Sequence, residues 1–569
     1  MTTGQIIQMT ILAVYLIVLV VVGKKAAGQV KSNTDYLLSG RQMSWLIVAG
    51  CLVGTHFSGA AITTMSNFSY MYGLGGSLYE LFTIIGFLIC AVIYAKRVRL
   101  SGAFTISELF EIRYGLNVRL VAGFFIMLSG IAAAAAQFKA IGLIFSSMFG
   151  LPQNMGIVIA WCITAFYMIL GGAAAANYTI IPQLLCCLIA FPLVAVWSYF
   201  KNGGMAVIVA MQNLPDHYFS LLGPSVKLIL TWVLQWMWIN NWGSQWYFQK
   251  ASSARNVKHA KMGFLATGIA LAVMAMIPGL VIGLMARAMY PDLVNTEQSL
   301  SLIVAQAPIV LGGLAMTGIF AAGMSTVDGC AMGAVTVIVR DFYQRALGHT
   351  DMSAEKMNRA SRIITIIVLL IILAMATMFS SVVSALNFMI VFNTGNFGAL
   401  IAALFWKKAS KEGALISILS AGIFAIIWNV TGGSARFEAA WWSLLISMVL
   451  MVGISFIVSK TGPWWGGRPK PVRSGIKEDI MEFLSNRKAS MTDFIDRFGY
   501  NAVELRLAVS ELTMEGKISE VDYMTYKRSE FCSPGESYTR DASTARDIQM
   551  VVVVAVCILA FCIIWNISQ

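Results

Sequence analysis

Runs of about twenty apolar residues recur along this chain of 569 residues, and they constrain its fold more than any other feature. About twenty helical residues cross the hydrocarbon core of a bilayer, which is about 30 Å thick. Backbone amides cannot remain unpaired in lipid, so each run is expected to form a helix. The runs lie at residues 5–23, 44–65, 79–96, 120–149, 155–171, 179–200, 226–248, 262–285, 309–338, 363–380, 384–406, 412–431, 439–459 and 548–566. The sequence therefore predicts an all-α polytopic membrane protein with about fourteen transmembrane helices.

The composition excludes an ordinary soluble enzyme. Only 12% of the residues are charged, whereas soluble domains carry about 25%, and the mean hydropathy is +0.75. The four histidines are scattered, and no Gly-Lys-Ser/Thr loop that could cradle phosphates is present. We therefore expect neither a catalytic site nor an ATP-driven pump. The nine cysteines lack metal-ligand spacing, and we expect free thiols and no bound transition metal.

The positive charge alternates from loop to loop. Lys and Arg concentrate in the loops 24–42, 96–119, 249–262, 340–362 and 407–411, which hold 21 of them. Basic loops lie on the cytoplasmic side, so we expect a multi-pass plasma-membrane protein with both termini extracellular. The N-terminus lacks a basic region and a small-residue cleavage site, so we expect the first span to be a retained helix and not a signal peptide. The net charge of +13 thus indicates orientation and a hold on anionic lipid, and not a nucleic-acid partner.

Residues 460–547 form the one long polar stretch, which is expected to be cytoplasmic. Helical patterns at 476–487, 491–498 and 501–515 precede a polar, possible hairpin at 517–527. This order resembles a winged helix, but the stretch carries 14 basic and 14 acidic residues. DNA binding depends on a cationic excess, so we prefer a structural or regulatory module, with a regulatory protein as a possible partner.

Two spans contain small and polar residues in mid-membrane. They are Gly54–Gly59 in the second span and Ala321–Gly329 in the ninth, where hydroxyls accompany one carboxylate. Discontinuous helices at such places hold the ion and the substrate in secondary transporters, so both spans are expected to be interrupted. The alternative is close helix packing, with hydroxyls bonded back to their own helix.

The chain resembles the sodium:solute symporter family over most of residues 5–460. The resemblance rests on Thr105–Gly115, Gly171–Gln183, Ala321–Thr326 and Phe405–Lys408. It implies a leucine-transporter-like core of two inverted five-helix repeats, here spans two to six and seven to eleven, as in the fourteen-helix glucose-transporting branch. It implies a sodium-coupled importer of a small polar organic solute that works by alternating access. The alternatives are a transceptor that reports transport through residues 461–547, or a proton-coupled or uncoupled carrier.

The resemblance, together with the polar stretch and the last apolar run, predicts a domain organisation. The first extra helix and a cytoplasmic loop occupy 1–43, the transport core 44–411, two peripheral helices 412–460, the cytoplasmic module 461–547 and a last transmembrane helix 548–569.

By the same resemblance, one sodium ion is bound by the backbone carbonyls of Gly54, Phe57 and Ala322 with the hydroxyls of Ser325 and Thr326. Oxygen ligands without Cys or His suit sodium and not a transition metal.

A second sodium site of the family uses an Asp where this chain has Ile180. Asp328 stands where that site otherwise uses a Ser, so we expect its carboxylate to serve a second cation, sodium or a proton. The alternative is a salt bridge to Lys139. His56, beside the sodium site, is expected to be a neutral, hydrogen-bonded histidine, with a proton-sensitive group as the alternative.

The resemblance leaves the solute open. Tyr79, Glu80 and Thr83 match sugar-binding positions of the glucose-transporting branch, whereas Ala61, Trp238 and Leu386 do not match theirs. The aromatic and amide residues of Gln235–Gly243 could stack on a ring or hold a quaternary ammonium, or could anchor the helix at the interface. Lys139 could bind a solute carboxylate, pair with Glu80 or Asp328, or snorkel. The candidate solute-binding residues are Ser58, Tyr79, Glu80, Thr83, Lys139, Trp238, Asn241 and Asn387.

Overall fold

The computed structural model describes most of the chain and divides it into two compact units. The described residues are 3–27, 43–211, 214–215, 217–348, 354–406, 408–431, 439–461, 475–485, 487–498, 502–522 and 525–531. One unit combines Met1–Ala91 with Met127–Ile390, and the other combines Val92–Ile126 with Val391–Gln569. The span expected at 548–566 lies outside the described residues.

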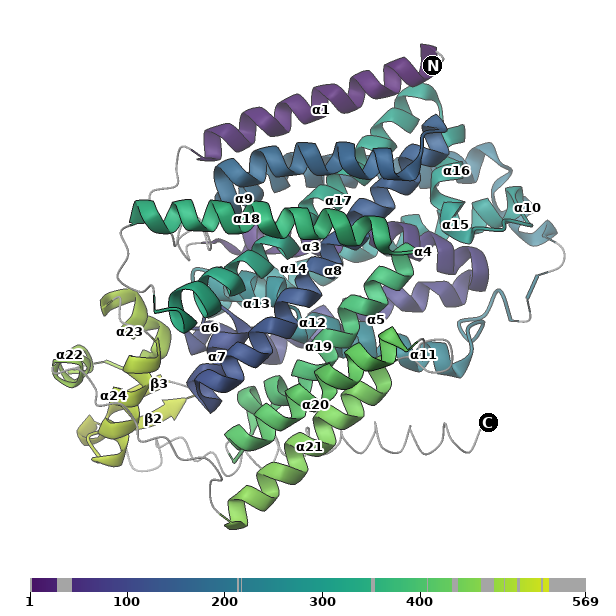
Figure 1. The fold of residues 1–569 in the computed structure, drawn as a ribbon. Coiled ribbons are helices and arrows are strands. Elements are labelled where there is room, and N and C mark those ends of the chain that lie inside the picture. The colour runs from purple at the N-terminus through teal and green to yellow at the C-terminus, as the bar shows by residue number, and fades with distance from the viewer. Residues whose placement is uncertain are drawn as a thin grey trace. The chain divides into compact units, whose positions relative to one another are not determined.

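The first unit contains most of the apolar helices (Figure 1). In chain order they are α1 (Thr3–Ala27), α3 (Trp45–His56), α4 (Gly59–Tyr72), η2 (Gly73–Ser77), α5 (Leu78–Ile89), α8 (Leu116–Phe149), α9 (Gln153–Lys201), α10 (Gly204–Ala210), α11 (Val226–Trp232), η4 (Val233–Asn240), α12 (Asn241–Gly243), α13 (Gln245–Ser253), α14 (Val257–Leu271), η5 (Ala272–Met276), α15 (Ile277–Met289), η6 (Thr296–Gln298), α16 (Ser299–Gln306), α17 (Ile309–Val337), η7 (Ile338–Ala346), α18 (Ala354–Met378) and α19 (Val382–Phe405). The helices α8 and α19 continue into the second unit.

The second unit adds two further apolar helices and the polar module. Its other elements are η3 (Cys90–Tyr94), α6 (Ala95–Ser101), α7 (Ile106–Tyr114), α20 (Lys411–Val430), α21 (Ala439–Thr461), α22 (Ile476–Phe483), β1 (Ala489–Ser490), α23 (Met491–Phe498), α24 (Ala502–Met514), β2 (Ile518–Asp522), β3 (Thr525–Arg528) and η9 (Ser529–Phe531).

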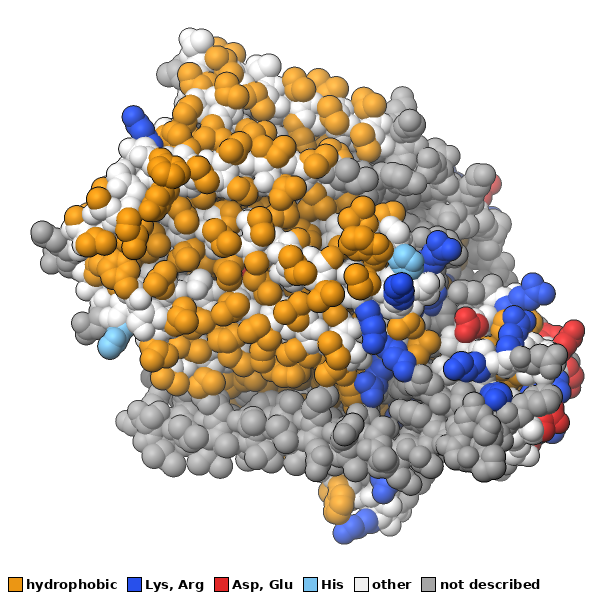
Figure 2. Space-filling model, turned by 180° about the vertical axis from the view of Figure 1, so that it is seen from behind, with side chains coloured by type: hydrophobic (Ala, Val, Ile, Leu, Met, Phe, Trp, Pro, Cys, Tyr) orange, Lys and Arg blue, Asp and Glu red, His pale blue; other side chains and the backbone are white. Residues whose placement is uncertain are grey.

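The helices have the length and the surface of membrane spans. Within the described ranges, nine helices are long and apolar enough to cross a bilayer, and three shorter apolar helices accompany them. Large apolar side chains such as Ile17, Leu188 and Ile367 are about half exposed. Figure 2 shows a broad face on which hydrophobic side chains predominate. Such a surface is stable in lipid and not in water, so the chain is a multi-pass membrane protein.

The fifth and sixth expected spans are not separate helices in this structure. Helix α9 runs without a break from Gln153 to Lys201, through the stretch where a turn was expected. Four consecutive alanines, Ala173–Ala176, follow Gly171 and Gly172 there, and alanine has the highest intrinsic helix propensity. The expectation of two helices at 155–171 and 179–200 is therefore wrong here, because the segment between them favours continued helix.

The polar module after α21 folds around its own small core. Its elements follow the order α22, β1, α23, α24, β2, β3, and the antiparallel sheet has the strand order β1-β3-β2. Ile480, Phe494 and Leu505 are fully buried. The expected three helices and hairpin are thus confirmed, within a few residues at their ends.

An ion-pair cluster on the surface of the module joins its helices to its sheet. Lys477 lies 2.8 Å from Glu511 and 2.7 Å from Glu515, and Lys517 lies 2.8 Å from Glu515. Hydrogen bonds from Lys477 and Lys517 lower the pKa of Glu515 to about 2. Because this cluster is exposed to solvent, it stabilises the folded module only slightly. The stabilisation is present at pH values above the ordinary pKa of a glutamate and is lost as the pH falls toward the lowered pKa of Glu515.

Helices α4 and α15 pack closely, and Gly283 permits that approach. An added Cβ at Gly283 would lie 2.4 Å from the carbonyl oxygen of Ser66 and 2.5 Å from the Cβ of Ser69. We predict that Gly283→Ala destabilises the protein by about 1–3 kcal/mol, because the backbone of α4 would have to shift. Thermal unfolding of the purified protein measures the effect.

The matched control is Gly453→Ala in α21, where an added Cβ meets no atom within 4 Å. This variant should unfold at or slightly above the wild-type temperature, because alanine is the better helix former. Equal melting temperatures for the two variants would contradict the close packing of α4 on α15.

Candidate functional site

The second expected span is interrupted as predicted, at Phe57 and Ser58. Helix α3 ends at His56 and α4 begins at Gly59, so the backbone amides at the start of α4 have no partner within their own helix. The Ser58 hydroxyl accepts the amide of Ala61 at 2.8 Å, and Oε1 of Gln137 accepts that of Ala60 at 3.1 Å. Buried side chains thus stabilise the break.

Two hydroxyls of α17 converge on the carbonyl of Gly54, in the last turn of α3. Ser325 Oγ lies 2.5 Å and Thr326 Oγ1 3.3 Å from this oxygen. The same hydroxyls lie 2.9 Å and 3.0 Å from the carbonyl oxygen of Ala322. Four of the five predicted sodium ligands therefore meet at one point, and Phe57, the fifth, is buried at the break beside them. We call these four oxygens the hydroxyl cluster.

The ninth expected span is not interrupted, contrary to the prediction. Helix α17 is continuous from Ile309 to Val337. The hydroxyls of Ser325 and Thr326 bond back to Ala322, three and four residues earlier in the same helix. This local bonding satisfies hydroxyls without unwinding the helix, so polar composition alone did not require a break.

A second interruption occurs in the seventh expected span, where none was predicted. The π-helix η4 runs to Asn240, α12 ends at Gly243, and Ser244 is extended, with φ −82° and ψ 124°, before α13 begins. The signal in the sequence was the small pair Gly243–Ser244. The first span of each expected five-helix repeat, the second and the seventh, is therefore broken, which is the arrangement of inverted-repeat transporters.

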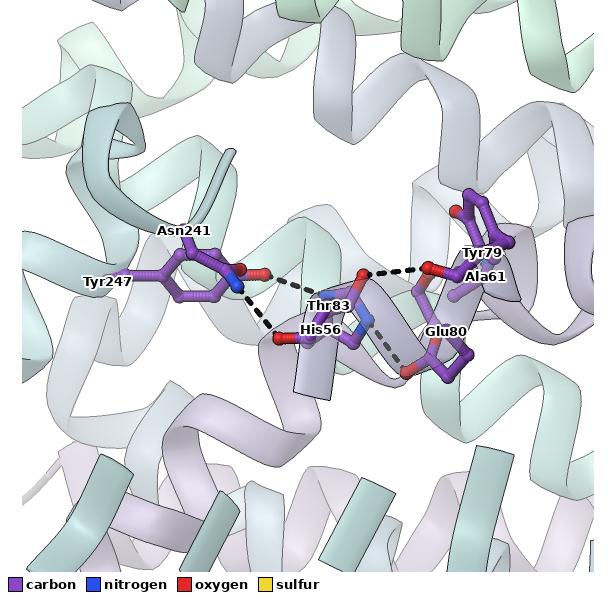
Figure 3. A network of polar contacts seen from close by, with 8 residues as sticks. His56, Ala61, Tyr79, Glu80, Thr83, Asn241 and Tyr247 are labelled. Carbon is purple, nitrogen blue, oxygen red and sulfur yellow. Dashed lines mark hydrogen bonds and ion pairs between the residues drawn. The ribbon is translucent and has the colours of Figure 1, made fainter. Parts of the chain in front are cut away.

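A buried polar network lies beside the first break (Figure 3). His56 Nδ1 is 3.0 Å from the Tyr247 hydroxyl, and His56 Nε2 is 3.1 Å from Oε1 of Glu80. The three side chains are buried. Both ring nitrogens of His56 are thus hydrogen bonded, as expected. Oε2 of Glu80 has no hydrogen-bond partner among the described residues.

A cavity lies between the two broken helices. It is lined by Thr55, His56, Ser58, Ala61, Tyr79, Ala133, Gln137, Trp236, Asn240, Trp246, Tyr247, Thr326, Cys330, Leu386 and Met389. Thr326 belongs both to this lining and to the hydroxyl cluster, so an ion at the cluster would lie next to a ligand in the cavity. We call it the central cavity. Its described lining includes no Lys, Arg, Asp or Glu.

The structure separates the predicted solute-binding residues. Ser58 and Tyr79 line the central cavity, and Glu80 lies behind His56. The Asn241 amide donates to the Thr83 carbonyl at 2.9 Å, so these two residues join helices and do not line the cavity.

Three other predicted positions are also turned away from the central cavity. The Trp238 ring packs on Trp242, with centroids 5.7 Å apart, and Asn387 is exposed. Lys139 lines a different pocket. Trp236, Asn240 and Gln137 occupy the lining instead. One residue along a helix turns a side chain by about 100°, and only the packed helices show which face is inside.

Asp328 is buried on α17 near two further polar side chains. The Tyr15 hydroxyl of α1 interacts electrostatically with Asp328 and with Gln183 of α9. Neither amide atom of Gln183 has a hydrogen-bond partner among the described residues. Lys139 does not pair with Asp328, since the acid that interacts with it is Glu297. The expected alternative, a salt bridge between Lys139 and Asp328, is therefore wrong.

The sequence and the fold of this chain are both similar to those of known proteins. The sodium:solute symporter family model matches residues 36–422. A sodium/glucose cotransporter of Vibrio parahaemolyticus is 22% identical over 80% of this chain and 91% of its own length. A sodium/proline symporter of Staphylococcus aureus is 25% identical over 73% and 85%. The solved structure of a Na+-coupled sialic acid symporter, substrate-bound and outward-open, has a similar fold, with a TM-score of 0.67, 17% identity, and coverage of 79% of this chain and 98% of that one.

Proposed function

Because the chain belongs to the sodium:solute symporter family, we propose that it imports a small polar organic solute together with sodium by alternating access. The protein is a transporter and not an enzyme, and its transport is coupled to sodium. The two broken helices that flank the central cavity support alternating access around a fixed site. We also propose a plasma-membrane location with the basic loops inside and both termini outside, from the alternation of charge.

We assign the sodium ion to the hydroxyl cluster together with the carbonyl of Phe57. The observation that carries this assignment is the convergence of Ser325 and Thr326 on the carbonyl of Gly54, at 2.5 and 3.3 Å. Carbonyl and hydroxyl oxygens are ligands for a hard cation. Sodium would join α17 to the broken end of α3, because its ligands come from both helices.

The test uses sodium itself, since the solute is not named. We predict that sodium chloride, compared with choline chloride, raises the melting temperature of the wild type by mass action. Ser325→Ala and Thr326→Ala should each need about tenfold more sodium for the same shift, because a lost ligand weakens binding by about 1–3 kcal/mol.

Thr317→Ala is the matched control for Thr326→Ala. Thr317 is buried in the same helix and bonds back to Gly313 at 2.8 Å, but it does not approach α3. Its loss should leave the sodium dependence unchanged. The assignment fails if Thr317→Ala and Thr326→Ala respond to sodium alike.

We further propose that Asp328 binds a second cation with help from Gln183 and Tyr15. Asp328 is 1% exposed, and a buried carboxylate is costly unless a cation or hydrogen bonds compensate for its charge. The amide oxygen of Gln183, which has no hydrogen-bond partner among the described residues, would supply a neutral ligand. The cation would be sodium or a proton.

We predict a Hill coefficient above one for sodium-dependent stabilisation of the wild type, falling to about one in Asp328→Asn. If the second cation is a proton, the wild type instead shows a pH dependence of sodium binding that Asp328→Asn lacks. A Hill coefficient of one without pH dependence in both proteins would refute the second site.

The lining of the central cavity favours a neutral or cationic solute. Aromatic rings of Tyr79, Trp236, Trp246 and Tyr247 form much of the wall, and amides of Gln137 and Asn240 supply directional hydrogen bonds. Such rings stack on a solute ring or attract an ammonium group. No described basic side chain is present there to bind a carboxylate, so an anionic solute would depend on the sodium ion.

The polar module supports a second function, that of a transceptor. The module has its own core, and the order of its helices and strands suggests a winged helix. Its helices α23 and α24 contact α6 and α7, respectively, in the basic loop at 96–119. We infer that the module reports the state of the transporter to a regulatory protein. Deleting residues 461–547 should leave sodium-dependent stabilisation intact and abolish the response of the host cell to the solute. If the shortened protein keeps both, the module does not have this role.

A further inference from the structure

A second pocket lies on another face of α8, away from the central cavity. It is lined by Asn67, Lys139, Leu143, Gln153, Val294, Asn295, Thr296, Glu297, Ser380, Ser381 and Val382. None of these residues lines the central cavity. Lys139 and Gln137 are two residues apart on α8, which turns their side chains by about 200°. Gln137 therefore points to the central cavity and Lys139 to what we call the loop pocket.

Two buried polar groups in the loop pocket lack partners. Lys139 is only 7% exposed. Its backbone carbonyl accepts from Gln153 at 3.2 Å, but its ammonium forms no ion pair or hydrogen bond with a described residue. Asn67 is 5% exposed, and its side-chain oxygen has no hydrogen-bond partner among the described residues. A buried acceptor without a partner costs free energy, and the Asn67 oxygen together with an unpaired ammonium in the same pocket points to a missing ligand.

The opposite charge in this pocket comes from Glu297, in the segment before α16. Its Oε1 accepts the backbone amide of Val383 at 3.3 Å, at the start of α19. Lys139 interacts with Glu297 electrostatically, yet no ion pair joins the two residues. The pocket therefore contains one positive and one negative side chain that do not form an ion pair and whose charges sum to zero.

The balance of charges selects the ligand. A simple anion or cation would leave a net charge in a partly buried site, which is unfavourable. A ligand with both charges satisfies both side chains and adds no net charge. Leu143, Val294 and Val382 supply apolar contact for a hydrocarbon side chain.

We propose that the loop pocket binds a zwitterionic amino acid, with its carboxylate on Lys139 and Asn67 and its ammonium on Glu297. The Asn67 amide would turn its NH₂ group to the carboxylate. This site is separate from the central cavity, but α4, α8 and α19 each contribute residues to both. A ligand that holds these helices together acts on the transport core without being the transported solute.

Three compounds with one hydrocarbon skeleton test the proposal: leucine, 4-methylpentanoate without the amine, and leucinamide without the carboxylate. Binding to the purified full-length protein is titrated by calorimetry in choline chloride without sodium. Leucine should bind at least about tenfold more tightly than either analogue, because each analogue loses one charge pair worth about 1.4 kcal/mol or more. Equal binding of all three, or no binding of leucine, overturns the proposal.

Variants assign the two charges. Lys139→Met should weaken leucine binding at least about tenfold, and this variant should bind leucine no more tightly than leucinamide. Glu297→Gln should bind leucine no more tightly than 4-methylpentanoate. The control is Lys201→Met, which removes an exposed lysine at the end of α9. Sodium-dependent stabilisation shows that each variant is folded, and it stays intact even if leucine binding is lost. Unchanged leucine binding in Lys139→Met refutes the site. If that variant does not fold, the affinities of Glu297→Gln and of the wild type for the three compounds test the proposal instead.

Discussion

A backbone interrupted within an apolar environment needs partners for its amides and carbonyls, and the break at Phe57 and Ser58 meets this need with side chains. Ser58 and Gln137 accept the free amides of α4, while Ser325 and Thr326 approach the carbonyl of Gly54. Each of these groups is buried, so none can be replaced by water at low cost. The break thereby fixes where α17 and α8 lie against α3 and α4.

The same interaction links the ion to the solute. Thr326 faces both the hydroxyl cluster and the central cavity, and His56, one residue before the break, connects the cavity to Glu80 and Tyr247. An ion that orders the end of α3 would therefore also order the wall of the cavity. Such coupling would need no long pathway, because Thr326 belongs both to the proposed ion ligands and to the cavity lining.

The loop pocket shows how one helix can serve two sites. Gln137 and Lys139 face opposite sides of α8, one toward a cavity without Lys, Arg, Asp or Glu in its described lining and the other toward a pocket with one charge of each sign. A lysine in a membrane span suggests a solute ligand from sequence alone. The structure places this lysine in the loop pocket, with Glu297 as the acid of opposite charge.

The sequence by itself determined the membrane class, the helical character of the spans and the break at Gly54–Gly59, because hydropathy and local composition depend on neighbouring residues. It also indicated the three helices and the hairpin of the polar module. Only the tertiary structure decided that α17 is unbroken, that Ser244 interrupts the seventh span, and that Trp236 and Asn240 line the cavity while Trp238 and Asn241 do not. Those outcomes depend on which face of each helix packs inward, and a shift of one residue rotates that face by about 100°.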